Sequence, residues 1–210
     1  MQALDKPPKR ELGGFRLADA EIALAGAFLL ERGIPADTFL IGVHPGARIA
    51  VRRWGDERFA EVARHLLRES DAHILWFSDP GNPSEAPQLE RCHKVSLEFR
   101  PFLAMLSLCR LLICNDSGPM HLANLLSVPV VAVIGSTNPV WFGPRGVQDR
   151  IVIRPEFWCR PCFDYCIFDQ PYCLRTITPG EVIASVQEAI QGLRAEPSLT
   201  VESYMATAPG

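Results

Sequence analysis

The chain has 210 residues, of which 48% are hydrophobic and 21% charged, with a formal net charge of −3. This length predicts one domain with or without tails, and the apolar content excludes a wholly disordered chain. No apolar run reaches the roughly 18–20 residues that a membrane span requires, and the near-neutral charge gives no support for a nucleic-acid surface. The opening MQALDKPPKR lacks the apolar stretch of a secretory signal, so we expect a cytoplasmic protein with mostly reduced cysteines.

A polar opening precedes the first helical pattern. Residues 1–14 are expected to be a linker or arm, because they are polar and contain a proline pair and a glycine pair. A helix is predicted over residues 17–32, since Leu17, Ala20, Leu24 and Phe28 recur three or four residues apart, and Gly33 provides a stop.

Strand and helix patterns then alternate. Apolar runs predict strands at residues 39–43, 73–77, around 95, 111–114, 130–134 and 151–153. Four helices are predicted between them. The first begins at Asp56, which can act as its cap, and the others lie near 85–92, over 101–109 and over 120–126. A last helix, capped by Thr178, is expected to run to about Leu193, and residues 196–210 are expected to form a disordered tail.

Near-continuous apolar strands that alternate with amphipathic helices are typical of a parallel sheet covered on both faces. The predicted fold is therefore α/β, a doubly wound parallel sheet, in one domain over residues 15–195. Ligands bind outside the carboxyl ends of the strands in such sheets. This rule selects four candidate loops, at residues 44–54, 78–85, 115–121 and 135–144.

The loop at residues 115–121 reads NDSGPMH and has features of an anion site. Asp116 or Ser117 can cap the following helix, and Gly118 allows a ligand to approach the backbone. The exposed amides and positive dipole end of such a helix attract phosphate. The alternative interpretation is an ordinary capped turn, with His121 as a hydrogen-bonded core residue.

The loop at residues 44–54 combines a possible backbone nest at His44–Ala47, which includes Gly46, with Arg48, Arg52 and Arg53. Arginine forks match phosphate oxygens in a bidentate manner. The alternative is that these arginines are solvated and that Trp54 only closes the core. The chain contains no GxGxxG and no GxxxxGK[ST] motif, which disfavours NAD enzymes and P-loop ATPases.

Several motifs in order, HPGA, then RRW, then NDSGPMHLANLLSVPVVAVIGSTNP, make the chain resemble family 9 glycosyltransferases. These are the heptosyltransferases of lipopolysaccharide core assembly and their relatives. The resemblance runs from about Gly42 to Ile190. It implies a Rossmann-like, C-terminal half of a GT-B glycosyltransferase, which binds a nucleotide-diphosphate sugar such as ADP-heptose. The sugar would pass to a lipopolysaccharide-type acceptor by an inverting, metal-independent reaction.

The resemblance also implies roles for individual residues. Arg52 matches the basic residue that contacts the donor diphosphate, with Arg53 as a substitute, and Glu85 matches the acidic residue that holds the ribose. The remaining implied donor-binding residues come from the loops at 44–47, 115–121 and 135–139, and they are Gly46, Asp116, Ser117, Gly118, His121 and Thr137.

The family's general base lies in an N-terminal domain, for which this chain leaves too little room. About 40 residues precede the first predicted strand, whereas such a domain needs on the order of 100 or more. We therefore name no catalytic base, and we expect a separate N-terminal domain or chain as a partner, no nucleic acid, and at most peripheral membrane association. The alternative to an enzyme is a non-catalytic or split nucleotide-sugar-binding module.

Cys159, Cys162, Cys166 and Cys173 form a C-x2-C-x3-C-x6-C pattern. Four thiolates can bind zinc tetrahedrally, and an iron–sulfur cluster is the other metal reading. A metal-stabilised interaction domain therefore remains a third alternative. The favoured interpretation is a structural thiol loop without metal or cofactor. Cys109 and Cys114 lie in apolar segments and are predicted to be core residues.

Overall fold

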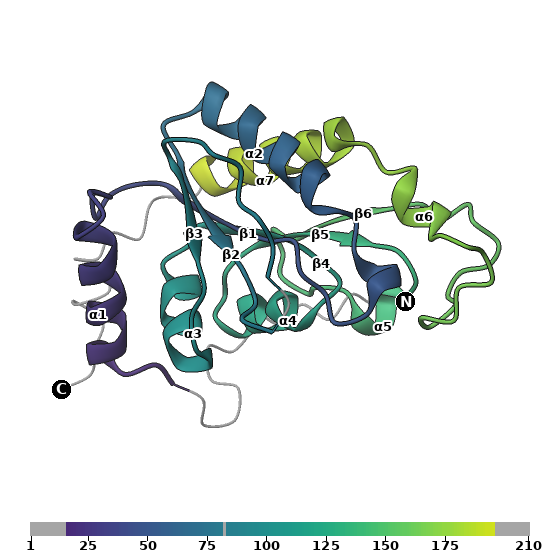
Figure 1. Ribbon diagram of the computed structural model, residues 1–210, viewed down its shortest axis with the longest axis horizontal. Helices are drawn as coiled ribbons and strands as arrows, with labels where there is room; N and C mark the ends of the chain where they lie inside the picture. Colours follow the sequence, from purple (N-terminus) through teal and green to yellow (C-terminus); the bar gives the residue numbers. More distant parts are fainter. Residues whose placement is uncertain (1–15, 82, 196–210) are drawn as a thin grey trace.

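The structure, a computed structural model, describes residues 16–81 and 83–195 (Figure 1). The predicted arm over residues 1–14 and the predicted tail over 196–210 lie outside the described residues.

Six strands form one parallel sheet at the centre of the molecule. The apolar, largely β-branched runs produce them, because both faces of a parallel sheet are buried. Their bounds are β1 Leu40–His44, β2 His73–Phe77, β3 Cys92–Val95, β4 Leu111–Asn115, β5 Val130–Ile134 and β6 Arg150–Ile153. Every residue of β1, β4 and β5 is buried. The predicted doubly wound α/β fold is confirmed.

The strand order is β3-β2-β1-β4-β5-β6. The chain moves outward from β1 through β2 to β3, and then returns to β4 on the other side of β1. Val43 pairs with Ile113 and His44 with Cys114 at this junction. The connections therefore diverge between β1 and β4, and ligands of doubly wound sheets bind at such a switch point.

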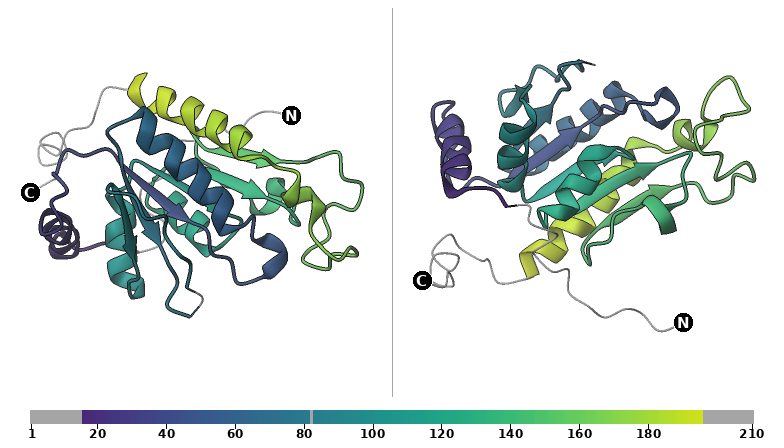
Figure 2. Two further views of the ribbon diagram at one scale, coloured as in Figure 1. Left: turned by 45° about the horizontal axis from the view of Figure 1, so that its top comes forward. Right: turned by 90° about the horizontal axis from the view of Figure 1, so that it is seen from below.

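Helices cover both faces of the sheet (Figures 1 and 2). On one face, α2 (Asp56–Glu69) packs against α7 (Pro179–Ala195), and Phe59, Leu66, Val182 and Val186 belong to the same buried cluster. On the other face lie α3 (Phe99–Ser107) and α4 (Gly118–Leu125), with α1 (Asp19–Leu30) packed outside α3. The short elements are η1 (Ala50–Arg52), α5 (Pro139–Phe142) and α6 (Tyr172–Arg175).

Helix α1 forms where it is predicted, but the predicted face is only partly right, because Leu17 is buried and Phe28 packs against the core, whereas Ala20 and Leu24 are exposed. Ala25 and Leu29 are its buried residues, whereas Leu24 is 71% exposed. The helix is apolar on nearly all sides, so periodicity alone does not define one buried face. Its orientation depends on contact with α3, including the bond from Arg100 Nε to Glu21 Oε1 at 2.8 Å.

The helix predicted near residues 85–92 is wrong, because residues 83–91 contain no helix. Ser84 is bound to the end of β2 instead, since its backbone amide donates to Ser78 Oγ at 3.0 Å and its hydroxyl accepts from Trp76 Nε1 at 3.0 Å. Pro87 also lacks the amide donor that a helix interior needs. The segment therefore crosses to β3 without regular structure.

Two predicted caps have different outcomes. Asp56 is the first residue of α2 rather than its cap, because Gly55 takes the cap position with a φ of 118° that suits glycine. Thr178 does cap α7. Its backbone amide donates to Glu181 Oε2 at 2.8 Å, and the Glu181 amide donates to Thr178 Oγ1 at 3.4 Å.

Candidate functional site

The loop after β1 is fastened to the end of β4 by a buried amide. Asn115 Nδ2 donates to the Pro45 carbonyl at 2.6 Å, and Asn115 Oδ1 accepts from the Trp54 amide at 3.0 Å. Arg53 Nε closes the loop on itself by donating to the Ala47 carbonyl at 2.7 Å. These contacts fix the path of residues 45–54 over the switch point, so Arg52 and the NDSGPMH loop lie at the same edge of the sheet.

Arg52 lies between two carboxylates. Its Nε and Nη2 donate to Asp164 Oδ1 and Oδ2, both at 2.6 Å, and its Nη1 lies 3.3 Å from Asp116 Oδ2. The hydrogen bond to Asp164 raises the pKa of Arg52, and the same bond holds the pKa of Asp164 below its usual range. The guanidinium is therefore charged and held in place, and the Arg52 side chain is 26% exposed.

Asp116 is a buried carboxylate that joins three loops. It is 2% exposed, and Thr137 Oγ1, from the loop after β5, donates to its Oδ2 at 2.7 Å. The same oxygen faces Arg52 from the loop after β1. Asp116, Arg52 and Thr137 were each predicted as site residues from sequence, and the structure brings all three into contact.

The amino end of α4 follows directly after Asp116. Ser117 occupies the cap position, but neither it nor Asp116 caps the helix through its side chain, so the capping prediction is wrong. Ser117 Oγ donates to the Asn115 carbonyl at 3.3 Å instead. The first turn of a helix leaves amides without intrahelical partners, and Gly118 is exposed there. Pro119 has no amide hydrogen and the Met120 amide donates to the Ser117 carbonyl at 3.1 Å, so this end offers the Gly118 amide and a positive dipole beside Arg52.

His121 lies one turn into α4 and is exposed. The alternative interpretation of a core histidine is therefore wrong. Trp54 is the reverse case, since it is 3% exposed and its Nε1 donates to the Ile177 carbonyl at 3.0 Å. It serves as a core residue, as the plainer interpretation of that loop expected.

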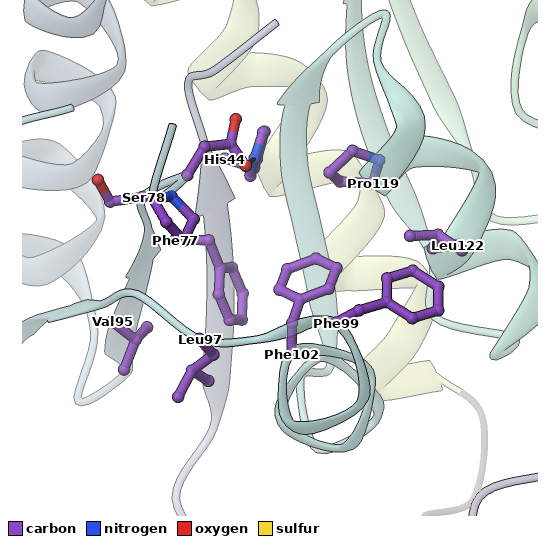
Figure 3. A pocket seen from close by; sticks show the side chains of 11 residues that line it. His44, Phe77, Ser78, Val95, Leu97, Phe99, Phe102, Pro119 and Leu122 are labelled. Carbon is purple, nitrogen blue, oxygen red and sulfur yellow. Dashed lines mark hydrogen bonds and ion pairs between the residues drawn. The ribbon is translucent and has the colours of Figure 1, made fainter. Parts of the chain in front are cut away.

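A pocket opens between the carboxyl ends of β1 and β2 and the helices α3 and α4 (Figure 3). Its walls are mostly apolar, with Phe99 and Phe102 placed between Phe77 on one side and Leu122 on the other. The complete lining consists of His44, Phe77, Ser78, Asp79, Pro80, Val95, Leu97, Phe99, Phe102, Pro119 and Leu122. Because Pro119 belongs to the first turn of α4, the pocket adjoins the helix end.

His44 and Asp79 supply polar groups to this pocket. His44 Nε2 lies 3.1 Å from Asp79 Oδ1, and this contact lowers the pKa of Asp79. His44 Nδ1 is buried and has no hydrogen-bond partner among the described residues. A Cβ at Gly46 would lie 2.7 Å from Asp79 Oδ2 and 3.0 Å from His44 Cε1. A side chain at Gly46 would therefore displace the Asp79 carboxylate or the His44 ring.

Glu85 does not join the other predicted site residues. Its side chain is 83% exposed and Oε1 accepts from Lys94 Nζ of β3 at 2.9 Å. The carboxylate that follows β2 and lines the pocket is Asp79 instead. Asp79 could have been found by the rule that selected the loop, because it is the second residue after the predicted strand. His44 is the last residue of its strand and was open to the same argument.

Asp164 had no signal in the sequence, because 112 residues separate it from Arg52. It lies in the cysteine segment, defined here as residues 159–173. All four cysteines of this segment are free thiols. Within residues 16–81 and 83–195, no group of three or more histidine, cysteine or acidic side chains is arranged to hold a metal ion.

Cys109 and Cys114 are buried core residues, as predicted, and burial raises the pKa of both thiols. In the part of the chain that the structure describes, no helix combines the length and apolar character needed to cross a bilayer.

Two likenesses in sequence and two in structure relate the chain to known proteins. The family model for glycosyltransferase family 9 (heptosyltransferase) matches residues 2–172. Lipooligosaccharide heptosyltransferase 2 of Campylobacter jejuni is 26% identical over 165 residues, which cover 71% of this chain and 51% of that protein. The chain thus spans about half the length of this curated relative.

The fold is also that of solved structures. The structure of E. coli ADP-heptose lps heptosyltransferase II superposes with a TM-score of 0.67 at 20% identity, covering 90% of this chain and 56% of that one. The glycosyl transferase family 9 structure from Veillonella parvula gives a TM-score of 0.68 at 24% identity, covering 85% and 53%. At these identities the likeness concerns the fold.

Proposed function

Because the chain belongs to glycosyltransferase family 9, we propose that it is the donor-binding part of a heptosyltransferase acting in the cytoplasm. The donor is a nucleotide-diphosphate sugar, ADP-heptose in the leading form of the proposal, and the acceptor is a lipopolysaccharide-type saccharide. The relative named above is a lipooligosaccharide heptosyltransferase, which supports this reaction class for the present chain.

The observation that carries the proposal is the approach of Arg52 to the amino end of α4. Arg52 Nη1 lies 3.3 Å from Asp116, and Asp116 is two residues before the first residue of that helix. A guanidinium fork and a helix N-terminus are the two protein groups best suited to phosphate oxygens. Together they would stabilise the negative charge that builds on the diphosphate as the sugar leaves.

The base and ribose are assigned to the pocket beside this helix end. Its aromatic and aliphatic walls suit the flat faces of a nucleobase, and Asp79 supplies a carboxylate for hydroxyl groups. Glu85, which the family resemblance matches to the ribose contact, is exposed, pairs with Lys94 and does not line the pocket. His121 and the Asp116–Thr137 pair are assigned to orientation of the donor.

A titration of the purified chain with ADP, UDP and GDP by calorimetry tests the donor assignment. We expect ADP to bind, and Arg52→Ala to weaken that binding by about tenfold or more, as expected for a lost charge-assisted contact. Arg64→Ala is the matched control, because Arg64 is an exposed arginine on α2 whose side chain lies 3.9 Å from Glu57. Absence of binding by all three nucleotides in a folded sample would reject the site.

A second candidate is a nucleotide-sugar-binding module that does not transfer the sugar alone. The fact that favours it is length, since the chain spans about half of the Campylobacter relative. A transfer assay with ADP-heptose and heptose-deficient lipopolysaccharide separates the two. Product formation by this chain alone excludes the module, whereas donor binding without product supports it.

A further inference from the structure

The guanidinium of Arg52 has two edges that can each donate a pair of hydrogen bonds. The side edge, Nε with Nη2, is filled by Asp164, with both bonds at 2.6 Å. The end edge, Nη1 with Nη2, keeps donors that Asp164 does not use. Only Asp116 approaches this end among the described residues, at 3.3 Å from Nη1. Asp164 thus determines which edge of the fork can meet a ligand.

Asp164 is itself held in place by the loop after β5. Ser136 Oγ donates to Asp164 Oδ1 at 2.9 Å. The Ser136 carbonyl accepts from the amides of Cys162 at 3.0 Å and Phe163 at 3.1 Å. Arg160 Nη2 adds a bond to the Thr137 carbonyl at 3.0 Å. The cysteine segment is therefore tied to the sheet immediately before Asp164.

The backbone at this point is in an unfavourable conformation. Phe163 has a φ of 48°, in the left-handed region that residues with a bulky side chain avoid, and Asp164, a residue type that tolerates this region better, has a φ of 76°. Such a conformation persists only when surrounding contacts impose it, and it is concentrated at functional sites. The contacts with Ser136 impose it here, and their result is that the Asp164 carboxylate meets Arg52.

We propose that Asp164 is a positioning residue of the donor site, which holds the Arg52 guanidinium with its end edge turned to the donor diphosphate. This inference rests on the proposed function. Arg52 has a long, flexible side chain on the exposed η1 turn, and fixing it before the donor arrives reduces the entropy lost on binding. In this proposal the function of the cysteine segment is to place the Asp164 carboxylate at the switch point.

The opposite role is a carboxylate that competes with the diphosphate for Arg52. The two roles predict opposite signs. A positioning residue strengthens donor binding, so its removal lowers the affinity for ADP. A competing anion opposes donor binding, so its removal raises the affinity for ADP. The geometry favours positioning, because Asp164 takes only the side edge of the fork, so that Asp116 alone among the described residues shares the end edge with a ligand. Asp164 is also anchored by Ser136 rather than placed on a free loop.

The test is a double-mutant cycle on the full chain, with ADP affinity measured by calorimetry. We expect Asp164→Ala to weaken ADP binding by about tenfold in the wild-type background. In the Arg52→Ala background, the same change should weaken it no further, because Asp164 acts through Arg52. Asp169→Ala is the control from the same segment, because among the described residues its carboxylate accepts one bond, from Tyr172 Oη at 3.2 Å, and it should leave ADP affinity unchanged.

Asp164→Asn serves if the alanine variant does not fold, because it keeps the size and one acceptor oxygen while it removes the charge. It should weaken ADP binding by about threefold. Unchanged or tighter binding in either variant overturns the inference, and so does an equal loss in the Arg52→Ala background, which would mean a merely structural role. Wild-type protein that binds no ADP rejects the proposed function as well. Arg52-dependent binding without a contribution from Asp164 rejects the inference alone.

Discussion

Replacement of Asn115 by alanine should destabilise the protein, because it removes the bonds that attach the loop after β1 to the end of β4. Asn115 is 0% exposed, and it bonds the Pro45 carbonyl at 2.6 Å and the Trp54 amide at 3.0 Å. Alanine leaves one buried acceptor and one buried donor without this partner. Each such group costs about 1–3 kcal/mol, so the free energy of unfolding should fall by about 2–6 kcal/mol. For a domain of this size, the lower bound corresponds to a Tm decrease of roughly 4 °C.

Urea unfolding followed by tryptophan fluorescence measures this loss. Asn138→Ala is the matched control, since Asn138 accepts one bond, from the Val140 amide at 2.9 Å at the start of the short α5. Loss of such a helix cap costs about 1 kcal/mol. If Asn115→Ala were no more destabilising than Asn138→Ala, the role of Asn115 as the fastening between β4 and the first loop would be refuted.

Three further predictions concern the pocket, the last helix and the cysteines. Gly46→Val should weaken ADP binding by about tenfold or more, because the new side chain would displace the histidine–aspartate pair that lines the pocket; unchanged affinity in calorimetry would contradict this. Arg154 and the α7 cap lower the pKa of Glu181 from 4.5 to about 2. Since the folded-state pKa is the lower one, this stabilisation is present above pH 4.5 and is lost as the pH falls toward 2. Glu181→Gln should therefore lower the Tm at pH 7 and flatten its dependence on pH between 4.5 and 2, and parallel curves for the two proteins would refute the cap. Protein purified without chelator should contain no stoichiometric zinc or iron by elemental analysis, and one metal per chain would instead favour the metal-stabilised interaction domain.

The strands could be predicted closely because they depend on local apolar runs. The run at residues 130–134 coincides with β5, and the run at 73–77 with β2. The errors arise where tertiary contacts decide. Leu24 is exposed although it has the spacing of a core residue, because α1 is apolar on most sides and turns toward α3. The helix expected near Pro87 is replaced by a segment without regular structure, in which Ser84 bonds to Ser78 and Trp76.

Local motifs located part of the site, and distant contacts complete it. Asp116 and Gly118 follow from the sequence of a single loop between a strand and a helix. Asp79 can be predicted from its position just after a strand, although the family resemblance indicates Glu85 instead. Asp164 could not be found, because it comes from a loop far along the chain, directly after Phe163 in an uncommon left-handed backbone conformation. Residue spacing carries no information about such a contact.

A crystal structure of the chain with ADP bound is the strongest test of the proposed donor site. We predict the diphosphate between the end edge of the Arg52 guanidinium and the Gly118 amide, with the base in the pocket beside Phe102. Nucleotide density at another edge of the sheet, or a diphosphate out of reach of both Arg52 and the amino end of α4, would contradict it.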